Sequence, residues 1–248
     1  ETPDEGADEI YSKVSLLNLY GRAYSGLAEY KKSLTYYLQA LDILNKSFEK
    51  DYLQEETILN NLSLAYLAVG ERDLAIKYMT EVGKRMEKRN ILDIYKVDTY
   101  SNLASIIPDR KLAKSYALKA YNILLNSKEE FRNDISFINA ATILAEFYFA
   151  EKNYSEAEKI ILSGYEYAKV NYPKNILSFS NYLYLYGDIA AVKNKDYDTC
   201  IKYSTIIIDE LAKLDASSSN LVKPRILKWS CHSGKGEKEA AFDELYKA

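Results

Sequence analysis

A pattern of small and aromatic residues recurs along this 248-residue chain about every 42 residues, and this spacing restricts the fold more than any single residue does. One small residue marks each copy, and these residues are Gly21, Ser63, Ala104, Ala145 and Gly187. Each copy reads as two stretches with apolar residues at i, i+3, i+4 and i+7, which is the period of an amphipathic helix. A pair of helices cannot bury its apolar face alone, so the pattern predicts tandem helix pairs stacked on one another.

The residues inside each copy resemble the tetratricopeptide repeat. The first copy has Leu17, Tyr20, Gly21, Tyr24, Tyr30, Ser33, Tyr37 and Ala40, which fit the motif W-x₂-L-G-x₂-Y…A-x₃-F. Four more copies keep these offsets, apart from one extra residue between the helices of the fifth copy and three fewer in the third. A degenerate sixth copy surrounds Trp229. The resemblance implies an all-α, right-handed superhelical solenoid, and we expect eleven or twelve antiparallel helices.

The same pattern predicts the organisation of the chain. Residues 1–7 carry Pro3 and Gly6 without periodicity and are expected to form a frayed tail. Residues 8–214 hold repeats one to five, and residues 215–248 hold a linker and a partial sixth repeat. Because no capping helix follows the sixth copy, we expect this end to open first, to favour self-association, and to belong to a longer parent protein.

Composition excludes several classes of function. The net charge of -3 and the lack of a long basic segment argue against nucleic-acid binding by this segment. No stretch reaches the roughly 18 to 20 apolar residues of a membrane span, so no membrane contact is expected from it. The compartment stays open between the cytoplasm and the extracytoplasmic part of a membrane-anchored protein.

Catalytic and metal chemistry also find little support. His232 is the single histidine, and the sequence has no metal-ligand spacing, so we expect no enzyme activity, cofactor or metal site. Cys200 occupies the small-residue position of its second helix and is predicted to be a buried thiol, with a bond to Cys231 as the lesser alternative. The run Lys84–Arg89 ends a helix and is expected to be structural, whereas the run Lys223–Lys228 could face a phosphate or a partner.

The resemblance also implies a binding surface, because the first helices of a tetratricopeptide array line its concave side. On that register the groove-facing residues include Ser15, Thr57, Asp98, Ser101, Ser105, Thr142 and Phe149. The candidate peptide-binding residues are Asn18, Arg22, Asn60, Asn61, Asn102, Asn139, Glu146, Asn181, Tyr184 and Asp188. Asparagine offers both a donor and an acceptor, so a ladder of asparagines could pair with the backbone of an extended peptide.

This ladder of amides is similar to that of the bacterial pheromone-sensing regulators, which bind short peptides. It also resembles tetratricopeptide sensor domains of membrane-anchored bacterial regulators. We therefore predict a non-catalytic peptide- or protein-binding domain, the sensing part of a larger signalling regulator. Two alternatives stay open: a free-standing adaptor that assembles a complex, and a polar helix face that only meets solvent. A carboxylate clamp of the cochaperone type is not expected, because copies two and three offer Asn61 and Asn102 without basic partners.

Overall fold

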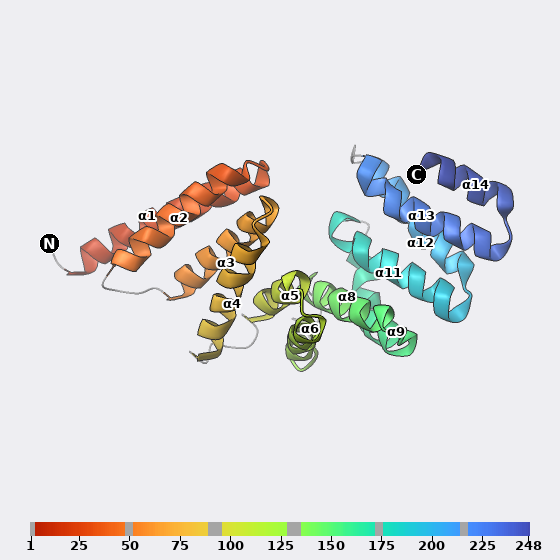
Figure 1. The fold of residues 1–248 in the computed structure, drawn as a ribbon, viewed down its shortest axis with the longest axis horizontal. Coiled ribbons are helices and arrows are strands. Elements are labelled where there is room, and N and C mark those ends of the chain that lie inside the picture. Colours follow the sequence, from red (N-terminus) through yellow and green to blue (C-terminus); the bar gives the residue numbers. More distant parts are fainter. Residues whose placement is uncertain (1–2, 48–51, 89–95, 128–134, 172–175, 214–217) are drawn as a thin grey trace. The chain divides into compact units, whose positions relative to one another are not determined.

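The computed structural model describes residues 3–47, 52–88, 96–127, 135–171, 176–213 and 218–248, and every regular element in these ranges is an α-helix (Figure 1). The helices are α1 (Pro3–Gly26), α2 (Tyr30–Lys46), α3 (Tyr52–Ala68), α4 (Arg72–Lys88), α5 (Val97–Ile106), α6 (Arg110–Leu125), α8 (Ile135–Ala150), α9 (Tyr154–Ser163), α10 (Tyr165–Asn171), α11 (Ile176–Asn194), α12 (Tyr197–Lys213), α13 (Ser218–Lys235) and α14 (Lys238–Lys247). Consecutive helices contact one another as hairpins, which confirms the predicted all-α, tetratricopeptide-like solenoid.

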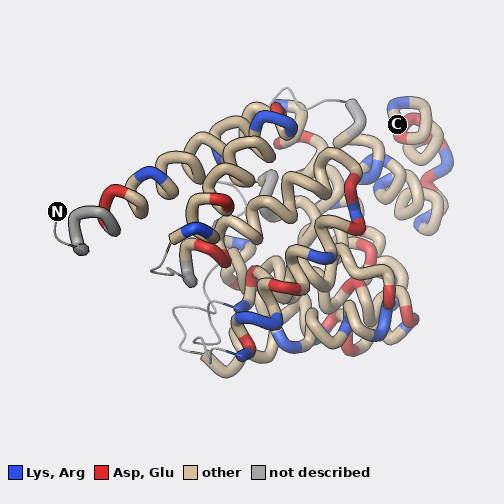
Figure 2. The backbone as a smooth tube through the Cα atoms, turned by 60° about the vertical axis from the view of Figure 1, so that its left-hand side comes forward, with Lys and Arg blue, Asp and Glu red and all other residues tan. Residues whose placement is uncertain are grey.

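The chain divides into two compact units, residues 1–116 and residues 117–248, and the division falls within α6. Of the predicted tail, residues 3–7 begin α1, and residues 1–2 lie outside the described part. Residues 215–217 of the linker expected before copy six also lie outside it, and α13 begins at Ser218. Basic and acidic residues are interspersed along the helices of both units (Figure 2), as the small net charge suggests.

The hairpin turns repeat one hydrogen-bond pattern. The N–H of Glu29 donates to the carbonyl of Tyr24, and that of Glu71 to Tyr66, both at 2.9 Å. The residue before each donor has a positive φ, 57° at Ala28 and 89° at Gly70, which is the left-handed cap of a Schellman motif. In copy five the bond joins Asp196 to Ala190, one residue further apart, so the predicted insertion in this turn is confirmed.

The small residues that mark the copies lie where the two helices of a hairpin cross. Ser63, Ala104 and Ala145 are at most 4% exposed, as the prediction requires. In copy one, a Cβ at Gly21 would lie 2.5 Å from Cδ1 of Tyr37, so this crossing admits only glycine unless the ring moves. Small residues therefore set how closely the paired helices approach.

Tyrosine rings pack between the paired helices, as predicted from their spacing. Tyr24 stacks on Tyr36 and Tyr66 stacks on Tyr78, with interplanar angles of 5° and 3°. These two pairs are 42 residues apart in the sequence, so the same contact recurs in successive copies. Offset aromatic pairs of this kind add to the burial of apolar surface in each hairpin.

Copy four departs from the prediction because its second helix is interrupted. A turn at Gly164 separates α9 from α10, so the described residues hold thirteen helices rather than eleven or twelve. A Cβ at Gly164 would lie 2.6 Å from Cδ1 of Ile138 on α8, which shows how closely the two helices approach there. The periodic pattern continues through this glycine and gives no sign of the break.

The prediction of a free thiol at Cys200 is wrong. A disulfide joins Cys200 on α12 to Cys231 on α13, with Cα atoms 6.3 Å apart. The burial of Cys200 was predicted correctly, since its side chain is fully buried. The pairing depends on how one repeat packs against the next, and the sequence pattern within a single repeat does not reveal that distance.

One member of the basic run at the end of α4, Arg85, has the structural role that was expected of the run, whereas Lys84 and Lys88 are exposed. The guanidinium of Arg85 forms ion pairs with Glu55 on α3 and, at 2.7 Å, with Glu81 one turn earlier. The desolvation of Arg85 on burial lowers its pKa, but these two carboxylates outweigh that effect and raise the pKa overall. Arg89, the last residue of the run, lies outside the described residues.

Candidate functional site

In unit 1 the predicted ladder of asparagines forms hydrogen bonds between successive first helices. Asn61 Nδ2 on α3 donates to Asn18 Oδ1 on α1 at 3.0 Å. Asn102 Nδ2 on α5 donates to Asn60 Oδ1 on α3 at 3.4 Å. In each pair one amide donates through Nδ2 and the other accepts through Oδ1. The Oδ1 atoms of the two donors and the Nδ2 atoms of the two acceptors have no protein partner among the described residues. The ladder therefore joins the repeats and still offers hydrogen-bonding groups.

Other predicted groove residues of unit 1 divide into exposed and buried ones. Arg22, Thr57, Asp98 and Ser105 are exposed, as a groove surface requires. Ser101 is only 7% exposed, so its predicted place on the groove surface is wrong. The helix α5 is short and packed tightly, with seven of its ten residues buried, which turns this position inward.

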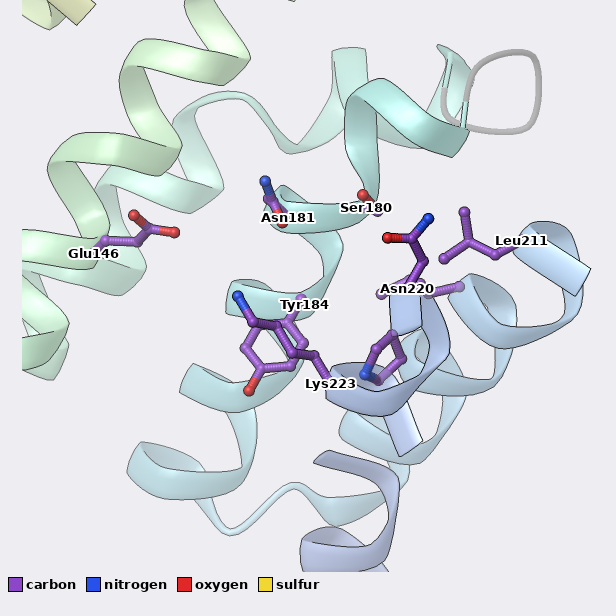
Figure 3. Close-up of a pocket in the computed structure, with 9 residues that line it drawn as sticks. Glu146, Ser180, Asn181, Tyr184, Leu211, Asn220 and Lys223 are labelled. Atoms are coloured by element: carbon purple, nitrogen blue, oxygen red, sulfur yellow. The ribbon is translucent and has the colours of Figure 1, made fainter. Parts of the chain in front are cut away.

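Unit 2 contains a cavity of about 410 Å³ between α8, α11, α12 and α13 (Figure 3). Three predicted binding residues line it: Glu146 on α8, with Asn181 and Tyr184 on α11. The cavity is completed by Ser180, Ile207, Leu211, Asn220, Lys223 and Pro224. Predicted residues from two successive first helices thus meet at one site.

Helix geometry explains why these side chains converge. Ser180, Asn181 and Tyr184 lie within four residues on α11, and residues at i, i+3 and i+4 share a helix face. Asn220 and Lys223 are related in the same way on α13. In Figure 3 the side chain of Glu146 projects from α8 toward α11. Ile207 and Leu211 of α12, at 1% and 4% exposure, supply the apolar part of the lining.

The polar groups of this cavity lack partners within the protein. Over the described part of the chain, Glu146 and Lys223 form no ion pair or hydrogen bond, although they attract one another electrostatically. The side chains of Asn181, Tyr184 and Asn220 likewise form no hydrogen bond with described residues. Four of these side chains are exposed and Tyr184 is half-buried, so their hydrogen-bonding groups are open to water or to a ligand that enters the cavity.

The cavity changes the acidity of its lining groups. Desolvation raises the pKa of the Glu146 carboxyl, and the positive charge of Lys223 partly offsets this effect. Burial also raises the pKa of the Tyr184 phenol, and the nearby Asp188 adds to the rise. Asp188 lies one turn further along α11 and outside the cavity lining, and its pKa is raised by burial alone. Both carboxyls are therefore held where solvation is weaker than in water.

Some predicted residues of unit 2 lie elsewhere. Asn139 is exposed on α8, and neither it nor Asp188 belongs to the cavity lining. Phe149 packs edge-on against Tyr154 at the hairpin turn. Thr142 is 6% exposed and donates to the carbonyl of Ile138 at 2.7 Å, so its predicted place on the groove surface is wrong.

The contribution of α13 was only partly foreseen in the sequence. The run Lys223–Lys228 was noted as a surface for a partner, but its members differ in the structure. Arg225 and Lys228 both form ion pairs with Glu244 on α14, at 3.1 and 2.9 Å, and share its single negative charge. Lys223 alone of these three lines the cavity. The weak match of copy six to the repeat concealed this role.

Neither metal chemistry nor membrane insertion is suggested by the described residues. Among them no group of three or more His, Cys, Asp and Glu side chains is placed to hold a metal ion. None of the helices traced here is long and apolar enough to cross a membrane. His232 lies 2.6 Å from Glu237 at the turn between α13 and α14, apart from the cavity.

Comparison with known proteins agrees with this architecture. A family of tetratricopeptide repeats matches residues 13–88. A search of curated protein sequences finds no significant match. The match covers the first two copies, and the described residues as a whole have the fold of a tetratricopeptide-like solenoid.

Solved structures that share this fold include Rap proteins. The apo form of RapI has a TM-score of 0.70 and 14% identity, covering 95% of this chain and 81% of that one. The Rap conjugation gene regulator of the plasmid pLS20, bound to the Phr* peptide, has a TM-score of 0.66 and 12% identity, covering 99% and 65%. Aspartyl phosphate phosphatase F from Bacillus subtilis has a TM-score of 0.68 and 12% identity, covering 95% and 58%.

At these identities the likeness shows a shared fold. Tetratricopeptide domains are usually non-catalytic, although the last of these three structures is titled a phosphatase. The chain spans less than two thirds of both the peptide-bound regulator and the phosphatase.

Proposed function

We propose that this chain is a peptide-binding domain and the sensing part of a larger bacterial signalling regulator. The observation that carries the proposal is the cavity of unit 2, where predicted groove residues of two successive first helices meet unpaired polar groups of α13. Amide and hydroxyl groups there can pair with a peptide backbone, and the apolar wall of α12 can accept a side chain.

The chemistry of unit 1 is compatible with the same role. The asparagines of α1, α3 and α5 each keep an unused donor or acceptor. An extended chain lying across these helices would meet such groups at every repeat. The Rap regulator in complex with Phr* supports the proposal, since a protein of this fold binds a peptide.

The test is selection of random hexapeptides displayed on phage against the immobilised chain, followed by calorimetry with the synthetic peptides. We expect Asn181→Ala to weaken binding by about 1 to 3 kcal/mol, because backbone groups of the peptide would lose their partner. The matched control is Asn194→Ala, at the exposed end of the same helix. Failure to enrich any peptide, or equal binding by both variants, would refute the proposal.

The regulator role needs a second observation. The coding sequence on either side of these residues, read in the source genome, separates the two alternatives. A DNA-binding or kinase segment supports the sensing role. Its absence from the complete gene would favour an adaptor that binds peptides without a linked output.

A further inference from the structure

The cavity of unit 2 holds two opposite charges that do not meet. Glu146 lies on α8 and Lys223 lies on α13, and both belong to the lining. They attract one another, yet no ion pair within 4.0 Å joins them. Of the other basic residues on α13, Arg225, Lys228 and Lys235 each pair with a carboxylate, so Lys223 is left uncompensated by the described residues.

The donors around Lys223 suit a carboxylate. The ammonium offers three donors, and the Asn220 amide lies one turn earlier on the same helix face. Tyr184 adds a phenol hydroxyl, which is protonated at neutral pH and can therefore donate a hydrogen bond. Together these groups could satisfy several lone pairs of one carboxylate, and charge-assisted bonds of this kind are the strong ones.

Glu146 restricts which anion can enter. A ligand with several negative charges would bring like charges close to the Glu146 carboxylate, which disfavours its binding. A cationic group beside the ligand's carboxylate would instead pair with Glu146. A cavity of about 410 Å³ has room for a short peptide segment of about two to three residues.

Pro224 supplies an independent reason why this part of α13 is open to a ligand. It lies inside the helix, where its missing N–H leaves the carbonyl of Asn220 without its normal partner four residues later. Both residues line the cavity. The helix is therefore missing one backbone hydrogen bond at the wall of the cavity.

We propose that the unit 2 cavity selects a dipolar peptide segment, with a carboxylate bound by Lys223 and an ammonium or guanidinium group bound by Glu146. This inference rests on the proposed peptide-binding function and adds the chemistry of the ligand. The carboxylate can come from a chain terminus or from an Asp or Glu side chain.

The experiment uses the whole 248-residue chain and pools of fluorescein-labelled tetrapeptides, with fluorescence anisotropy as the readout. The three leading positions are mixtures of apolar residues. One pool ends in lysine with a free carboxylate, one in lysine amide, and one in norleucine with a free carboxylate. A fourth carries glutamate before a terminal lysine amide. If the bound carboxylate is the chain terminus, the pool with a free terminal lysine should bind about tenfold more tightly than the lysine amide pool and the norleucine pool. If it is a side chain, the pool with glutamate before lysine amide should bind about tenfold more tightly than the pool with lysine amide alone.

Variants test which group of the ligand is recognised by Lys223 and which by Glu146. Lys223→Met should remove the advantage of a carboxylate, and Glu146→Gln should remove the advantage of lysine over norleucine. Lys238→Met and Glu239→Gln, both exposed on α14, are the matched controls and should change neither preference. Equal binding of all four pools, or preferences that survive in the cavity variants, would overturn the proposal.

The competing explanation is that Glu146 and Lys223 form an ion pair with each other in the free protein. A double-mutant cycle of Glu146→Gln and Lys223→Met measures their coupling through the thermal stability of the free protein. Negligible coupling is expected if the charges stay apart; strong coupling would show that they pair with each other and would sink the inference. Hexapeptides selected from phage that bind without any charge preference would overturn this inference while leaving the proposed function intact.

Discussion

The disulfide between Cys200 and Cys231 should hold the last hairpin of unit 2 onto the rest. It joins α12 to α13 across a separation of 31 residues. In the chain-entropy treatment, a loop of this length restricts the unfolded state by about 4 kcal/mol, between the values for 15- and 100-residue loops. For a chain of this size about 1 kcal/mol corresponds to roughly 2 to 4 °C in Tm, so reduction should lower the transition of α11–α14 by roughly 8 to 16 °C.

The assay is thermal unfolding by circular dichroism with and without a phosphine reductant. The control is the double variant Cys200→Ala with Cys231→Ala, which should melt at the same temperature under both conditions. Thiol titration of the unreduced, denatured protein should find no free thiol. Two titratable thiols, or a melt unaffected by the reductant, would refute the reasoning. A bond that persists in cells would favour the oxidising, extracytoplasmic alternative for the compartment.

Four further predictions follow from the packing and charges. Ala157→Leu, at a fully buried crossing in copy four, should destabilise the protein by about 1 to 3 kcal/mol in thermal melts, and an unchanged melt would contradict the assigned register. Asn60→Ala combined with Asn102→Ala removes both partners of one hydrogen bond, so chemical denaturation should show little change while calorimetry shows peptide binding weakened by about 1 to 3 kcal/mol. Burial raises the pKa of Asp188 in the folded state, so the ionised carboxylate destabilises the fold at pH values above the folded-state pKa, and this destabilisation disappears below the pKa of the unfolded state. Asp188→Asn should therefore raise Tm at pH 7 and leave Tm unchanged at pH 3. Phe242, 71% exposed on α14, should promote self-association, so Phe242→Ser should shift sedimentation profiles toward monomer, and a wild-type protein that stays monomeric at high concentration would contradict this.

The fold was predictable because each repeat folds through local contacts. The crossings at Ser63, Ala104 and Ala145, the turns, and the insertion in copy five all follow from spacing within one copy. Features that depend on contacts between copies were raised from the sequence but could not be decided there. The Cys200–Cys231 bond is one, and the role of Lys223 is another, since both require knowing how α13 packs on its neighbours.

The candidate site was predictable in part for the same reason. Register placed Glu146, Asn181 and Tyr184 on inward-facing positions, and these residues do line one cavity. Ser101 and Thr142 share that register but are buried, because close packing on α5 and α8 closes over short side chains. Periodicity identifies a helix face, whereas the depth of a groove depends on the sizes of neighbouring side chains.

Each helix crossing of the first two copies contains one serine, but the serine lies on the second helix in copy one and on the first helix in copy two. In copy one Ser33 on the second helix donates to the carbonyl of Gly21 at 2.8 Å, and in copy two Ser63 on the first helix donates to the carbonyl of Ala75 at 2.6 Å. The two pairs occupy equivalent positions, 42 residues apart. A chimera that exchanged only second helices would place two serines at one crossing and none at the other. The interchangeable part for building longer or shorter arrays from this chain is therefore the whole hairpin, because each crossing is matched to its own pair of helices.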